Sequence, residues 1–201
     1  MTRNPTRPRV DAAQRKEQLI DAAADIVSAA GISALTIEAV VAKVGVHRPI
    51  VYRHFDNAEM LLDAVIEREL NSLRTSSDNA IAGVVGFDAR IRAAVSAWME
   101  HFASNSALMS IGLVRPPTND ALRARRREQN EHSMRFFVAE FTAEGVSPQD
   151  AQIAGAALLH ALVGVVNLWG QRSISRKVAI DRYVRIARAT LDALLNAPPA
   201  M

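Results

Sequence analysis

One short segment concentrates the side chains that could bind a polyanion. His47, Arg48, Tyr52, Arg53 and His54 all fall between residues 47 and 54. An arginine guanidinium presents paired N–H groups that match O6 and N7 of guanine, while Tyr, His and further Arg side chains donate to phosphate oxygens. The chemistry of such a segment is hydrogen bonding to nucleic acid, with no bond made or broken.

The residues before this segment predict how it is held. Thr36 suits a helix N-cap, because its hydroxyl can accept from an unpaired N–H of the first turn. Gly45 follows the apolar end of that helix, where a left-handed conformation costs glycine little. A second helix should begin near His47, with Pro49 in its first turn. Residues 36–55 therefore predict a helix-turn-helix, whose second helix enters the DNA major groove.

The predicted contacts divide into two kinds. Arg48 is expected to contact a base directly, and Pro49 and Ile50 to make apolar contacts, including contacts to thymine methyl groups. The other side chains should position the duplex through its backbone; they are Thr36, His47, Tyr52, Arg53 and His54. Glu38, in the first helix, either accepts from a cytosine amino group or repels the phosphates. A solvated or intramolecularly paired Glu38 is the favoured interpretation.

The same residues resemble a known family. The family's run G-V-x-x-x-x-[LVI]-Y-x-[HY]-F is matched by Gly45, Val46, Val51, Tyr52, His54 and Phe55. The match continues through residues 56–62, DNAEMLL, and covers roughly residues 12 to 70. The segment is similar to the DNA-binding domain of the TetR (tetracycline repressor) family of transcriptional regulators. Ala58 departs from the pattern, because many members carry a phosphate-binding lysine there, and Glu38 replaces a residue that is basic in some members.

Composition sets the broad class. Hydrophobic residues make up 49% of the 201 residues, which predicts a globular chain, and abundant Ala and Leu favour an all-α fold. The absence of cysteine excludes disulfides and thiolate metal sites and fits a cytoplasmic location. A net charge of +3 is a weak indication of nucleic acid by itself. The N-terminus has no apolar core of a signal peptide, and no uninterrupted apolar run reaches membrane-spanning length.

Four regions are expected along the chain. They are a disordered basic arm over residues 1–10, a helix-turn-helix domain over 11–56, a larger helical domain over 57–196 and a tail over 197–201. The arm could also reach phosphates or a minor groove. Apolar periodicity and capping residues predict helices over about 11–30, 56–76, 88–104, 105–114, 119–143, 148–171 and 178–195. Residues 77–87 read as an irregular connection. The arginines at 123–127 read as a solvated face paired with Glu128 and Glu131.

The resemblance implies what the larger domain does. Family members dimerise through their last two helices, here about 149–171 and 178–195, and their larger domain surrounds an effector cavity. The residues expected to line that cavity are Trp98, Phe102, Met109, Met134, Phe137, Phe141, His160 and Asn167. Large residues on two helices would face the small residues of a third, with His160 or Asn167 fixing an apolar molecule. For any one aromatic or Met residue, ordinary core packing is the simpler interpretation.

No catalytic pattern accompanies these elements. The histidines form no metal-binding motif, and neither a cofactor nor a metal is expected. The sequence therefore predicts a dimeric regulator, and more specifically a repressor of a palindromic operator on double-stranded DNA, released by an apolar small molecule. The alternative is a helical small-molecule-binding module that has lost specific DNA binding, for which Ala58 and Glu38 leave room.

Overall fold

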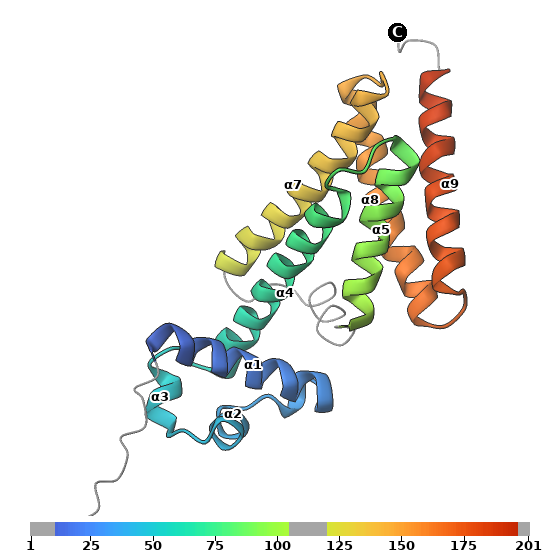
Figure 1. Ribbon diagram of the computed structural model, residues 1–201. Coiled ribbons are helices and arrows are strands. Elements are labelled where there is room, and N and C mark those ends of the chain that lie inside the picture. Colours follow the sequence, from blue (N-terminus) through green and yellow to red (C-terminus); the bar gives the residue numbers. More distant parts are fainter. Residues whose placement is uncertain (1–10, 105–119, 197–201) are drawn as a thin grey trace, which may run out of the picture. The chain divides into compact units, whose positions relative to one another are not determined.

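The computed structural model describes residues 11–104 and 120–196, and every regular element in these ranges is a helix (Figure 1). The elements are α1 (Ala12–Ala30), η1 (Ile32–Ala34), α2 (Ile37–Val44), α3 (Arg48–Tyr52), α4 (Ala58–Ile81), α5 (Phe87–Ser104), α7 (Asp120–Ala143), α8 (Pro148–Gly170) and α9 (Arg176–Leu195). The all-α fold is confirmed. The basic arm, the short helix expected over 105–114 and the C-terminal tail lie outside the described residues.

The described residues form two compact units that divide within α4. The first unit ends at Glu69 and the second begins at Leu70. The start of α4 joins the first unit because it buries an apolar face there and because Arg68 pairs with Asp21 of α1, Nη1 to Oδ1 at 2.5 Å. The domain boundary expected after residue 56 was drawn at the end of the helix-turn-helix and stays a prediction.

The first unit is built around the buried faces of α1, α2 and α3. Its core residues come from each helix in turn and are Leu19, Ile20, Ala23, Val27, Leu35, Ile37, Val40, Val51, Phe55, Leu61, Leu62, Val65 and Ile66. This spacing at three and four residues is what an amphipathic helix requires to bury one stripe. Burial of the stripes leaves the outer faces of α2 and α3 exposed to solvent.

The turn between α2 and α3 follows the expectation from sequence. Thr36 caps α2, its Oγ1 accepting from the Ala39 amide at 3.0 Å. Gly45 ends α2 at φ 70°, a left-handed conformation that disfavours a side chain. Pro49 lies in the first turn of α3, where its missing N–H has no intrahelical partner to lose. The helix-turn-helix is confirmed.

The ends of α4 differ from the prediction. The helix begins at Ala58 and not at the expected residue 56, because Asn57 caps it, its Oδ1 accepting from the Met60 amide at 2.9 Å. The far end runs on to Ile81, so the connection expected over 77–87 is irregular only after that residue. Arg90 explains the extension, because its Nη1 donates to the Ile81 and Val84 carbonyls at 3.2 and 3.0 Å. The Ile81 carbonyl, a helix-end acceptor, is thereby satisfied, which the sequence pattern could not show.

The second unit packs α8 between α7 and α9, with α5 beside α9. Tyr183 of α9 is wholly buried, and its hydroxyl donates to the Leu158 carbonyl of α8 at 2.7 Å. Burial raises the pKa of that hydroxyl, so it stays a donor. Gly155 lets α7 approach α8, since a Cβ at this position would lie 3.1 Å from Met134 Sδ and from Phe137 Cβ. The small residues of α8 therefore serve close helix packing.

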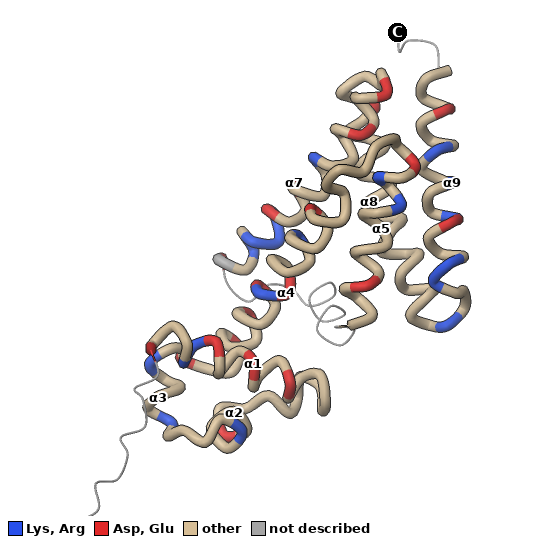
Figure 2. Tube along the Cα trace, in the orientation of Figure 1, with Lys and Arg blue, Asp and Glu red and all other residues tan. Residues whose placement is uncertain are grey.

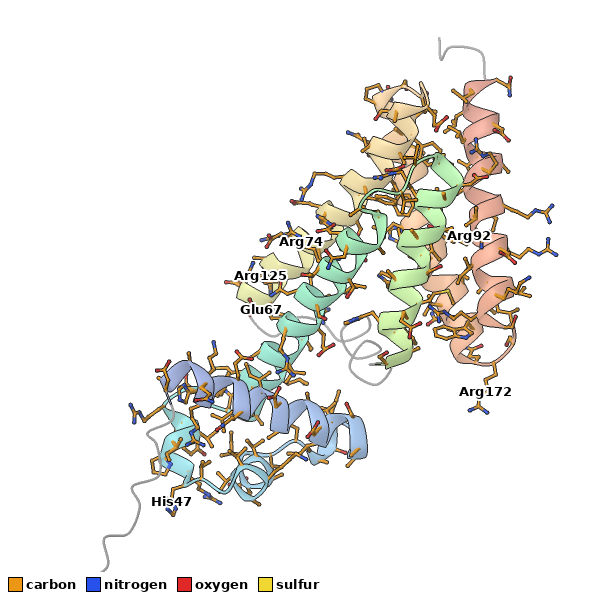
Figure 3. All side chains as sticks on the ribbon, viewed as in Figure 1. His47, Glu67, Arg74, Arg92, Arg125 and Arg172 are labelled. Atoms are coloured by element: carbon orange, nitrogen blue, oxygen red, sulfur yellow. The ribbon has the colours of Figure 1, made fainter. Side chains whose placement is uncertain are left out.

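Charges on this unit are interspersed in sign along α7 and α9 (Figure 2). Glu128 of α7 pairs with Arg125 on its own helix and with Arg74 of α4, at 3.0 and 3.2 Å (Figure 3). The hydrogen bond from Arg125, followed by that from Arg74, holds the pKa of the Glu128 carboxyl below its usual value. The prediction that the arginine run is a paired, solvated face is confirmed for these residues.

Candidate nucleic-acid interface

The exposed face of α3 carries most of the residues expected to bind DNA. His47 precedes the helix with extended backbone and makes no side-chain capping bond, and its side chain lies at the outside of the unit (Figure 3). Arg48, Pro49, Tyr52 and Arg53 are exposed as well, whereas Val51 is fully buried and anchors the helix. A short helix with one buried residue and several exposed polar neighbours presents its side chains outward for contact.

Spacing around α3 separates two surfaces. Arg48 and Tyr52, four residues apart, belong to one stripe. Ile50, Arg53 and His54 line an open groove shared with α1 and with the α2–α3 turn. The groove also exposes Arg15 and Lys43, and the acidic residues Asp11, Asp21 and Asp25. Apart from Thr36, which caps α2, the predicted set is thus brought together on α3 and the residues that flank it, but over two sides of that helix.

Arg48 has an unexpected partner for a base-reading residue. Its Nη2 lies 2.6 Å from Oε1 of Glu38, which is in the first turn of α2. Both side chains remain more than half exposed, at 59% and 56%. The expectation of an intramolecularly paired Glu38 is confirmed, and its partner is the residue assigned to guanine.

Other cations of this unit were not singled out from sequence. Lys16 of α1 places Nζ 6.0 Å from the ring centroid of Phe55, and Lys43 of α2 pairs with Asp25 of α1 at 3.2 Å. Each is engaged within the unit, which aligns α1 with the helix-turn-helix. Residue spacing in the sequence does not reveal these two contacts, because the partners of Lys16 and Lys43 depend on how the helices cross.

A separate cavity of about 50 Å³ lies in the second unit. Its lining comes from the end of α4 and from α5, α7 and α8, and consists of Ser77, Asp78, Ile81, Ala94, Val95, Trp98, Gln129, His132, Ser133, Phe136, Phe137, Leu159 and Leu162. Trp98 and Phe137 were expected there. The polar pair at this cavity is His132 and Asp78, Nε2 to Oδ1 at 2.8 Å, which the sequence had not indicated because Asp78 was assigned to a connection.

The other residues of the expected effector set lie elsewhere. Phe141 packs edge-on against Phe87, and Phe102 is buried between Trp98 and Trp169. His160 and Asn167 are on the exposed side of α8, where His160 Nδ1 lies 2.8 Å from the Ala156 carbonyl of its own helix.

Met134 packs against Gly155, and Met109 is outside the described residues. The periodicity of α8 did not reveal which of its faces would be covered, so His160 and Asn167 were assigned inward.

Comparison with known proteins identifies what the first unit resembles. Residues 19–65 match the family described as "Bacterial regulatory proteins, tetR family". The chain is also 28% identical, over 93 residues, to the HTH-type transcriptional activator FasR of Mycolicibacterium smegmatis. That match covers 46% of this chain and 42% of the relative, so the chain matches less than half the length of this curated relative.

Solved structures show the same fold over nearly the whole chain. A TetR-like transcriptional regulator from Rhodococcus sp. RHA1 superposes with a TM-score of 0.69 at 18% identity, covering 94% of this chain and 100% of that one. The transcriptional regulator FadR from Bacillus subtilis, in complex with stearoyl-CoA, superposes with a TM-score of 0.63 at 16% identity, covering 90% and 97%. At these sequence identities the similarity shows that both units have the fold of these relatives, and nothing about function.

Proposed function

Because residues 19–65 match the tetR family of bacterial regulatory proteins, we propose that the chain is a transcriptional regulator of that kind, which binds a palindromic operator as a homodimer. The observation that carries the proposal is the exposed face of α3. It presents Arg48 and Tyr52 on one stripe, while the buried Val51 anchors the helix. One helix of this length reads few base pairs, so two copies related by a two-fold axis supply the remaining affinity and specificity.

The proposed roles follow the exposure of each side chain. Arg48 contacts guanine, with Pro49 and the half-buried Ile50 against neighbouring apolar base edges. Backbone phosphates are held by the remaining members of the set, which are Thr36, His47, Tyr52, Arg53 and His54. A protein of this kind acts in the cytoplasm, where bacterial DNA lies.

The dimer forms through α8 and α9. The exposed stripe of α8 recurs at heptad-like spacing and consists of Ile153, Ala157, His160, Gly164 and Leu168. Ile153 is 64% exposed, and a Cβ on Gly164 would meet open space. Exposed Val178, Ile186 and Leu195 supply apolar surface on α9. An apolar stripe with small residues at its centre suits close packing against a second copy.

The same stripe accounts for the apolar character of α8. By length and composition this helix could cross a membrane, yet only 28% of its most apolar window is buried within the chain. It packs against α7 and α9 and accepts the Tyr183 hydroxyl, as a helix of a soluble core does. A partner subunit covers the rest of its apolar surface in this proposal.

An apolar small molecule regulates DNA binding. The cavity beside Trp98 and Phe137, about 50 Å³, is far below the ~300–1,000 Å³ typical of ligand sites, so the ligand must part α5, α7 and α8 to enter. Because α4 contributes Ile81 to this wall and extends into the first unit, such parting moves α4. The stearoyl-CoA bound by FadR of Bacillus subtilis makes long-chain acyl-CoA the first ligand to test.

Selection of DNA from a random duplex pool tests the central proposal. Full-length protein should enrich a sequence with two inverted half-sites, and a reporter carrying that sequence should be repressed by the protein. An increase in reporter output would show that the protein is an activator and not a repressor, while the proposal of an operator would stand. No enrichment over the input pool would favour the alternative function, a helical module that binds a small molecule without specific DNA recognition.

The effector proposal has its own test. Stearoyl-CoA should release the selected duplex from the protein. Trp98→Ala should change the acyl-CoA concentration needed for release, since it removes a side chain from the cavity wall and so enlarges the cavity. Trp169→Ala removes an equally large side chain that does not line the cavity and is the matched control. Equal responses of both variants would remove the support for this cavity as the effector site.

A further inference from the structure

Glu38 is an acidic residue on a surface that is proposed to face a polyanion. It belongs to the first turn of α2, and its Oε1 is 2.6 Å from Arg48 Nη2, the group that the proposed function places against a guanine. Both partners are more than half exposed, so the pair lies on the surface that would face DNA. A carboxylate there is repelled by phosphates and lowers affinity for every duplex.

The ion pair itself contributes little to the stability of the fold. Exposed ion pairs contribute little to folding, because both ions are already well solvated and two long side chains lose freedom when they meet. The first unit holds α2 and α3 through buried apolar residues such as Val40 and Val51. The consequence of the pair must therefore be sought in the DNA complex.

We propose that Glu38 is a positioning residue that gives Arg48 selectivity for guanine over phosphate. An arginine carries five N–H donors in a planar fork, and one contact to Glu38 leaves enough of them for the bidentate pattern of guanine O6 and N7. Glu38 fixes the plane of the guanidinium for that pattern. This inference rests on the proposed function, since it concerns how the DNA-binding surface discriminates.

The pair also restrains non-specific binding. Arg48 and Glu38 together carry no net charge, so in a complex with arbitrary DNA they release few counterions. An unpaired Arg48 would instead bind a phosphate wherever the protein landed. By cancelling that charge, Glu38 lowers affinity for arbitrary sequences more than for the operator, and the ratio of the two affinities rises.

The test compares Glu38→Gln with wild type in the full-length protein. Each is titrated with the selected operator and with a scrambled duplex of equal length, at several salt concentrations. E38Q should bind scrambled DNA roughly tenfold more tightly per half-site at about 0.1 M salt, with a salt slope steeper by about one. Affinity for the operator should change much less, so the operator-to-scrambled ratio falls.

Asp25→Asn is the matched control. Asp25 is an exposed carboxylate of the same unit that pairs with Lys43 at 3.2 Å, so its loss changes net charge by the same amount without touching Arg48. D25N should shift both duplexes alike and leave the ratio unchanged. A ratio that falls equally in both variants, or in neither, would overturn the role of Glu38.

A double-variant cycle shows whether Glu38 acts through Arg48. In an Arg48→Ala background, E38Q should no longer change the operator-to-scrambled ratio. If E38Q lowers the ratio as much without Arg48 as with it, Glu38 acts alone and the inference fails. Wild-type protein that binds both duplexes equally would overturn the proposed function itself, an outcome that the other results cannot imitate.

Discussion

Arg48 and Arg53 lie on the same short helix and should nevertheless act differently on DNA. Arg48 shares its stripe with Tyr52 and contacts Glu38, whereas Arg53 lines the groove beside α1. A residue that reads a base affects one sequence position, while a residue that binds a phosphate affects all sequences.

Alanine substitution of each arginine tests this division. R48A should cost about 1–3 kcal/mol of binding free energy on the operator and relax the preference at one base pair per half-site. R53A should weaken binding to operator and scrambled duplexes by similar factors. The measurement is a set of titrations against operators that vary at single positions, and identical specificity profiles for the two variants would contradict the assigned roles.

At the residue scale, local rules predicted the α2–α3 turn correctly but missed the cap of α4, which is Asn57. The cap at Thr36 and the left-handed turn at Gly45 depend only on neighbouring backbone, and both were predicted. The partner of Glu38 was not, because it depends on how α2 and α3 cross. The same limit applies to His132 and Asp78, which meet across two helices far apart in the chain.

Among the helices, α8 shows how composition and function can be confused. Its small residues had suggested a cavity, but Gly155 lies against Phe137 and Met134 in close helix contact. The cavity beside Trp98 is lined by the larger side chains Leu159 and Leu162 of the same helix. Periodicity in the sequence was enough to predict that these helices form. Which face of each helix a neighbour covers could be known only from the packed structure.

Gly155→Ala should destabilise the second unit. A Cβ at 3.1 Å from Met134 Sδ and Phe137 Cβ is closer than ordinary van der Waals contact, and overpacking of this kind costs about 1–3 kcal/mol. The free energy of unfolding measured in denaturant would report the change.

Gly170→Ala is the control, because its Cβ would meet only Phe102 Cε1, at an ordinary 3.9 Å. A G155A protein as stable as G170A would show that the helices yield without strain, contrary to the packing described.

On the scale of the whole molecule, the proposed function requires two copies to associate before α3 can read an operator. The stripe of α8 that includes Ile153 and Leu168 is the largest uncovered apolar feature of that helix. The two compact units divide within α4, because each half of that helix joins a different core, and the domain bounds expected from sequence stay a prediction.

Ile153→Glu should therefore separate the dimer. It places a charge in the proposed interface, where desolvation without a partner is unfavourable. Sedimentation at micromolar concentration should show a monomer, with loss of operator binding. Val85→Glu, a change of the same kind at the exposed α4–α5 turn, should leave the dimer intact. If the I153E protein stayed dimeric, the dimer interface would not include this stripe of α8.

Sequence-specific DNA binding through α3 is the central claim, and one titration tests it most directly. Wild-type protein is added to labelled operator duplex and to its scrambled counterpart, each at several salt concentrations, with R48A measured beside it. Tight operator binding that weakens steeply with salt, is lost on scrambling and is reduced by R48A is the predicted result. Equal affinity for both duplexes, unchanged by R48A, would contradict it and leave the chain as a ligand-binding module with this fold.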